Sequence, residues 1–219
     1  MDAYISLDLL FRWLHVLFGV TWIGLLYYFN FVQTEYFKEA EATAKADAVK
    51  KLAPRALWWF RWGAMFTFLT GVILLEFVRK GWGLDSYIIV GALMGTLMFL
   101  NVWLIIWPNQ KIVCGITPGD AAKAAPKAGL ASRTNTLFSA PMLMGMLGSF
   151  HGPGDAGTTV VGAAGNSAPS LGLWIAIGLI LVLQANAIWG KTGPMTTVKG
   201  VIHCSIALAV VMLALLQFV

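Results

Sequence analysis

Long apolar stretches alternate with short polar segments along the whole chain. Each stretch is about 17–25 residues long, which is the length an α-helix needs to cross a hydrocarbon layer roughly 30 Å thick at about 1.5 Å per residue. Six such stretches lie at about 7–32, 54–78, 86–107, 134–150, 171–189 and 198–219. The pattern therefore predicts an all-α fold over residues 1–219, a single polytopic membrane helix bundle with about six transmembrane helices.

The fourth stretch is the weakest of the six. It is short and contains Pro141, Gly145 and Gly148. Proline and glycine are tolerated in membrane helices when neighbouring helices satisfy the freed backbone groups. We retain this helix because the distribution of basic residues depends on it.

The basic residues are divided unequally between the two sides of the predicted bundle. Twelve of the fifteen lie in or beside the connections after the first, third and fifth helices: Lys38, Lys45, Lys50, Lys51, Arg55, Arg61, Lys111, Lys123, Lys127, Arg133, Lys191 and Lys199. The opposite side holds Arg12, Arg79 and Lys80. Basic loops stay in the cytoplasm, so we expect both termini on the outer, periplasmic side.

Composition supports a membrane location. Hydrophobic residues make up 58% of the chain and charged residues 11%, a balance that a water-soluble domain of this length does not need. The net charge of +5 follows from the basic cytoplasmic loops, so it implies no nucleic-acid partner. We expect a multi-pass protein of the bacterial inner membrane.

Two connections differ from the short loops. The segment 34–53 is rich in Ala, Lys and Glu, which predicts a cytoplasmic helical extension or amphipathic connector. The segment 152–170 is rich in Gly, Ala, Ser and Thr, which predicts a loose outer loop or a surface that a partner covers.

Two histidines are expected in the outer half of the bundle. His15 follows Arg12 by about one turn, and His151 ends the fourth stretch. Two imidazoles at one depth on different helices could ligate the iron of a b-type haem from its two faces. Gly19 and Gly148 would leave room for the macrocycle, and Arg12 could meet a propionate. The alternative is a hydrogen-bonded helix residue and an ordinary loop histidine.

A second polar group is expected toward the cytoplasmic side. It comprises Asn30, Arg61, Asn101, Asn186 and His203 on five different helices. Such a group could form a quinone or small-substrate pocket, with His203 accepting a proton and Arg61 holding an anionic or carbonyl oxygen. The alternative is hydrogen bonding between helices, worth about 1 kcal/mol per pair, with Arg61 extending to the headgroups.

Four segments carry a family resemblance: RWLHVLFGVTWIGLLYYFNFVQ at Arg12–Gln33, RALWWFRWGA at Arg55–Ala64, NVWLIIWPNQK at Asn101–Lys111 and SRTNTLFSAPMLMGMLGSFH at Ser132–His151. They resemble the membrane domain at the N-terminus of membrane-bound urate oxidases. The element formed by His15, Trp22 and Gly24 more loosely resembles the copper-resistance type D permeases and the haem-dependent protoporphyrinogen oxidases.

The resemblance implies a redox function. In the urate oxidase family a cytochrome c domain usually follows the membrane domain, which implies electron transfer from the membrane part to an outer haem. No such domain is recognised up to Val219, so we expect a separate outer cytochrome c or other redox subunit. Two alternatives stay open: a haem-free accessory or structural subunit of a larger respiratory or membrane complex, and an enzyme that oxidises urate.

Overall fold

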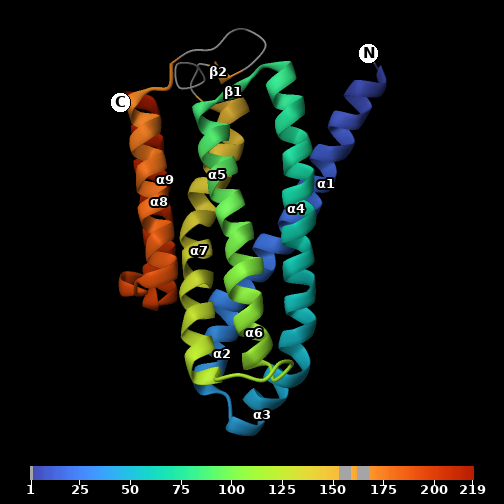
Figure 1. Ribbon diagram of the computed structural model, residues 1–219, viewed down its shortest axis with the longest axis vertical. Coiled ribbons are helices and arrows are strands. Elements are labelled where there is room, and N and C mark those ends of the chain that lie inside the picture. Colours follow the sequence, from blue (N-terminus) through green and yellow to red (C-terminus); the bar gives the residue numbers. More distant parts are fainter. Residues whose placement is uncertain (1, 153–158, 162–167) are drawn as a thin grey trace.

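The computed structural model describes residues 2–152, 159–161 and 168–219, which form long helices lying side by side in an elongated bundle (Figure 1). Within these residues, five helices are long and apolar enough to cross a membrane. The protein is therefore an all-α, multi-pass membrane protein, as the apolar stretches predicted.

The first apolar stretch forms one long helical segment. It comprises α1 (Asp2–Tyr27), the π-helical turn η1 (Tyr28–Gln33) and α2 (Thr34–Glu39). The Thr34 hydroxyl donates to the Phe29 carbonyl five residues earlier, over 2.6 Å. π turns inside α-helices are rare and occur frequently at functional sites. This one carries the buried side chain of Asn30.

The second segment is helical well before the apolar stretch begins. It comprises α3 (Ala42–Asp47), the π turn η2 (Ala48–Leu52) and α4 (Ala53–Gly81). The predicted connector at 34–53 is thus largely helical, as expected for residues of high helix propensity. Beyond α4, the amides of Trp82 and Gly83 both donate to the Val78 carbonyl, over 3.0 and 2.9 Å. Gly83 has φ 92°, a conformation that favours glycine.

The third segment comprises β1 (Leu84–Asp85), α5 (Ser86–Leu100), the π turn η3 (Asn101–Ile106) and α6 (Trp107–Val113). Asp85 caps α5 by accepting a hydrogen bond from the Ile88 amide over 2.8 Å. Its other carboxylate oxygen accepts from Ser149 over 2.7 Å. The wide turn η3 ends two residues before Pro108, whose ring and missing N–H would disturb a regular α-helix.

Helix α7 (Ala121–His151) runs the length of the bundle (Figure 1) but is not among the five apolar spans. It packs against α5, α6 and α9, so much of its surface meets protein rather than lipid. Five polar side chains are buried in this helix: Arg133, Thr134, Asn135, Thr136 and Ser139. The predicted stretch 134–150 is therefore the upper part of a longer helix whose composition suits a protein interior.

Pro141 interrupts the hydrogen bonding inside α7, because it lacks the N–H that would bond to the Leu137 carbonyl. The Ser205 hydroxyl of α9 lies 2.9 Å from that carbonyl and 3.1 Å from the carbonyl of Thr136. A neighbouring helix thus compensates the proline, as membrane helices require.

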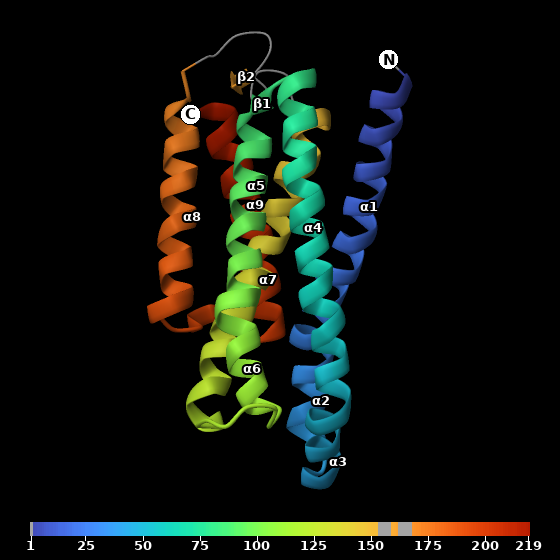
Figure 2. The same ribbon diagram turned by 45° about the vertical axis from the view of Figure 1, so that its right-hand side comes forward.

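The last two helices are α8 (Leu171–Trp189) and α9 (Val198–Phe218), joined by the 3-10 turn η4 (Gly193–Thr196). Their bounds coincide with the predicted stretches to within one residue. α8 lies on the side of the bundle away from α1 (Figures 1 and 2). Strand β2 (Thr159–Val161) pairs antiparallel with β1. Most of the predicted outer loop 152–170 lies outside the described residues.

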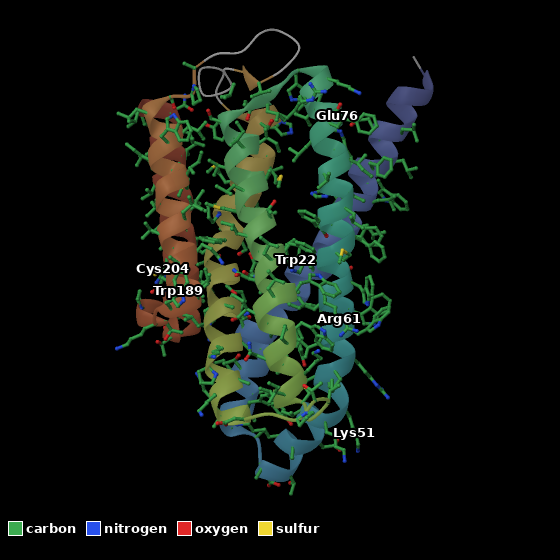
Figure 3. The ribbon with its side chains drawn as sticks, viewed as in Figure 1. Trp22, Lys51, Arg61, Glu76, Trp189 and Cys204 are labelled. Atoms are coloured by element: carbon green, nitrogen blue, oxygen red, sulfur yellow. The ribbon has the colours of Figure 1, made fainter. Side chains whose placement is uncertain are left out.

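The two ends of the bundle differ in charge. The N- and C-terminal ends lie together at one end (Figure 1), here called the terminal end. The segment around Lys51 lies at the other, basic end, whereas Glu76 lies near the terminal end (Figure 3). This arrangement agrees with the grouping of basic residues that the sequence predicted.

Candidate functional site

A closed network of side-chain amides ties three helices together. Asn101 of η3 donates to Asn135 of α7 over 2.8 Å and to the Gln184 oxygen of α8 over 3.0 Å. Gln184 donates back to the Asn101 oxygen over 2.6 Å, and Asn135 donates to the Met98 carbonyl over 2.9 Å. Asn101 and Asn135 are 1% and 0% exposed. These amides are paired with one another, which stabilises helix contacts.

A second set of hydrogen bonds joins the first segment to α7. The Asn30 amide donates to the Ser132 hydroxyl over 2.8 Å and to the Leu26 carbonyl over 2.9 Å. The hydroxyls of Tyr27 and Ser139 lie 2.9 Å apart. Asn30 and Asn101 therefore both face α7, each from a π turn, but they bond to different partners.

Three residues of the predicted cytoplasmic group lie elsewhere. The Arg61 guanidinium lies 3.8 Å from the centre of the Trp107 ring, in a cation–π contact. Arg61 lies nearer the basic end of the bundle than Trp22 does (Figure 3). Asn186 bonds to the Lys191 carbonyl over 3.1 Å at the end of α8. His203 is exposed on α9. The structure therefore does not bring the five predicted residues into one pocket.

Sequence reasoning missed the polar face of α7. Ser132, Asn135 and Gln184 complete the hydrogen bonds of the two predicted asparagines, and Arg133 is 7% exposed. One guanidinium nitrogen of Arg133, Nη1, has no hydrogen-bond partner among the described residues. The signal was present as five adjacent polar residues, 132–136, but it fell at the predicted start of a helix, where polar residues are expected.

His15 lies on the side of α1 that packs against α4. Its Nδ1 lies 3.1 Å from the Thr70 hydroxyl oxygen. The ring lies against Gly71, where an added Cβ would come within 3.0 Å of the His15 Cε1. Gly19, one turn further along α1, faces a methyl group of Thr67. The glycines at 19 and 71 therefore serve close packing of α1 on α4.

Arg12 extends from α1 toward the terminal end of the bundle. It pairs with Asp8 over 2.8 Å, and its guanidinium lies 5.2 Å from the centre of the Trp82 ring. Trp82 follows directly after α4, so this contact bridges two helices at that end. A propionate role for Arg12 stays a prediction.

His151 and Gly148 are arranged differently from the expectation. Gly148 is covered by the Tyr87 ring, since an added Cβ would lie 2.5 Å from the ring carbon Cδ1. His151 is exposed and has ring contact with its neighbour Phe150, whose ring is 5.7 Å from that of Trp82. The space beside Gly148 is therefore filled by α5 and leaves no room there for a macrocycle.

His15 and His151 do not share one depth. His15 is level with Gly71, whereas His151 is adjacent to Phe150, which contacts Trp82. Eleven residues of rise at about 1.5 Å each separate Gly71 from Trp82, or roughly 16 Å along the bundle. The two axial ligands of one haem must face each other across the iron. A single haem held by both histidines does not fit this geometry.

Part of the chain, residues 82–160, matches a family model described as urate oxidase N-terminal. No curated protein and no solved structure matches the chain. The matched region runs from the end of α4 to β2 and includes both buried asparagines of the amide network as well as Arg133. It agrees with the resemblance seen in the motifs at 101–111 and 132–151.

Proposed function

We propose that this chain is an electron-transfer protein of the bacterial inner membrane. It would hold a b-type haem through His15 and pass electrons from a membrane or cytoplasmic reductant to an outer cytochrome c. The observation that carries the proposal is an imidazole inside an apolar, membrane-crossing helix, tied at Nδ1 to Thr70. An ionisable residue at such a position costs on the order of a few kcal/mol and marks functional sites.

Two further observations support this proposal. The similarity of residues 82–160 to urate oxidase N-terminal regions favours an oxidoreductase. The bond from Nδ1 to Thr70 leaves the other ring nitrogen of His15 as the ligand atom, and ligating histidines commonly bond through their second nitrogen in this way. Haem would supply one-electron chemistry when bound. The proposal assigns only His15 as a ligand, because His151 lies at another level.

The orientation follows from charge. The basic end would face the cytoplasm, by the positive-inside rule. His15 lies level with Gly71, ten residues before the end of α4, and so in the half of the bundle nearer the termini. An acceptor would therefore approach from the outer side, where Arg79 and Lys80 lie.

A reduced-minus-oxidised absorption spectrum of the purified chain tests the proposal. We expect a haem α-band in the wild type and in His203→Ala, whose side chain is exposed on α9. His15→Ala should lose the band while remaining folded. His151→Ala should retain it, because His151 does not face His15. A wild-type protein without haem absorption after gentle purification would contradict the proposal.

A second candidate function is the oxidation of urate or a similar small reductant. It is favoured by the buried Arg133, whose free nitrogen could meet an anionic or carbonyl oxygen, within the matched region. Membranes containing the chain should then reduce added cytochrome c when urate is supplied. Arg133→Gln should lose this activity and the exposed Arg55→Gln should keep it. A chain that folds but shows neither haem nor urate oxidation would fit a haem-free accessory subunit.

A further inference from the structure

The Thr70 hydroxyl occupies a position that can act on the chemistry of His15. Thr70 is buried on α4, and its oxygen lies 3.1 Å from the His15 Nδ1. The same oxygen lies 2.6 Å from the Phe66 carbonyl and 3.0 Å from the Thr67 carbonyl. Three polar atoms thus converge on one hydroxyl group inside an apolar span.

Counting protons at this hydroxyl determines which atom donates to which. A threonine hydroxyl has one proton. Two oxygens 2.6 Å apart are at the distance of an O–H···O hydrogen bond, so the Thr70 proton is directed to the Phe66 carbonyl. The Thr70 oxygen can then only accept from the imidazole. His15 Nδ1 must therefore carry a proton and donate it.

The packing around the ring fixes this orientation. Gly71 leaves space for the edge of the ring beside the backbone of α4, with its missing Cβ only 3.0 Å from the His15 Cε1. Any larger residue at 71 would push the ring away from Thr70. The hydroxyl and the glycine are adjacent in sequence, so they present one binding surface to the imidazole.

We propose that Thr70 is a positioning residue that holds neutral His15 in the Nδ1–H tautomer and leaves the Nε2 lone pair free as a ligand for haem iron. The two ring nitrogens of a histidine are distinct, and the bond that one makes decides which nitrogen is available to a metal. The haem part of this inference rests on the proposed function, whereas the tautomer does not.

Nitrogen-15 NMR of the full chain, labelled at histidine and free of haem, tests the tautomer directly. The chain has three histidines, and the variants His151→Gln and His203→Gln assign the signals. We expect a protonated Nδ1 and an unprotonated Nε2 at His15 in the wild type. Thr70→Val should weaken this preference, because the Thr67 backbone would then remain as an acceptor for the ring, and Thr70→Ser should restore it because serine retains the hydroxyl.

Thr67→Val is the matched control. Thr67 is a buried threonine one turn before Thr70, its hydroxyl donates to the Gly63 carbonyl over 2.7 Å, and valine keeps the methyl group that faces Gly19. This variant should leave the His15 signals unchanged. The inference is overturned if wild-type His15 carries its proton on Nε2, or if the ratio of the two tautomers in Thr70→Val equals that of the wild type.

A second measurement separates this inference from the proposed function. If the chain binds haem, Thr70→Val should lower its haem affinity by about 10- to 100-fold, the usual effect of losing such a supporting bond, while Thr70→Ser and Thr67→Val remain close to wild type. If the wild type binds no haem, the proposed function fails and the NMR result alone decides on Thr70. An unchanged haem affinity in Thr70→Val would contradict the positioning role.

Discussion

Replacement of Gly145 by alanine should push apart two helices, α5 and α7, that pack backbone to backbone. Gly145 of α7 faces Gly91 of α5, where the two backbones touch. A Cβ at 145 would lie 2.8 Å from the Gly91 nitrogen, 2.8 Å from the Tyr87 carbonyl oxygen and 2.9 Å from the Gly91 Cα. All three are backbone atoms, so no side-chain rotation can relieve the contact.

The size of the effect follows from these distances. Reaching an ordinary contact of 3.4 Å requires the helices to move apart by roughly 0.6 Å. Overpacking of this kind typically costs about 1–3 kcal/mol. Alanine also favours the helical conformation over glycine by roughly 0.5–1 kcal/mol, which offsets part of that cost. We expect Gly145→Ala to lower the free energy of unfolding by about 1–2 kcal/mol.

Gly129 supplies a control on the same helix. An added Cβ at 129 meets no atom within 4 Å. Gly129→Ala therefore gains the higher helix propensity of alanine without a steric cost, and should be neutral or slightly stabilising. The free energy of unfolding of both variants can be measured in bicelles by steric trapping. Equal stability of Gly145→Ala and Gly129→Ala would refute the argument that the two backbones are in contact.

Two further predictions concern the bundle. Ser205→Ala should lower the free energy of unfolding by about 1–3 kcal/mol, because it leaves the Leu137 carbonyl unsatisfied. The loss should shrink in a Pro141→Ala background, where the restored N–H serves that carbonyl; equal losses in both backgrounds would contradict the compensation. In a background without Cys114 and Cys204, a cysteine replacing Lys80 should react with an impermeant thiol reagent in intact cells. One replacing Lys123 should be shielded, and the reverse pattern would invert the proposed orientation.

The helices could be predicted from the sequence because a bilayer imposes a simple rule. Every backbone group inside it must bond internally, and the lipid-facing surface must be apolar. The stretches at 171–189 and 198–219 therefore predicted α8 and α9 to within one residue. The bilayer rule does not predict the helical extensions at 34–53 and 107–113. They form because polar residues of good helix propensity continue a helix after it leaves the apolar region.

The depth of a residue was harder to predict, because it depends on where its helix begins. His15 lies thirteen residues after the start of α1, or about 20 Å at 1.5 Å per residue, whereas His151 is the last residue of α7. The sequence placed both histidines in the outer half, with Arg12 reaching the outer interface. In the structure the Arg12 side chain does extend toward that end, to Trp82. A long side chain that reaches the interface therefore does not fix the level of its own helix.

Small and polar residues inside apolar helices were ambiguous for a different reason. Gly148 was consistent with space for a cofactor, but α5 fills that space with the Tyr87 ring. Asn101 was consistent with a substrate pocket, but Asn135 and Gln184 bond to its amide group. The sequence of one helix shows only that something must pack against such a residue or bond to it. The packed bundle shows whether that partner is another helix or a ligand.

The same reasoning indicates where function should be sought. A buried amide whose partners are all protein groups has little capacity left for a ligand, since another bond would have to replace an existing one. The Arg133 guanidinium differs, because Nη1 has no partner among the described residues. His15 differs too, because its bond to Thr70 engages one nitrogen and leaves the other. Incomplete pairing therefore separates these two residues from the amides of Asn101, Asn135 and Gln184, and Arg61 shares it, since its Nη1 also has no partner among the described residues.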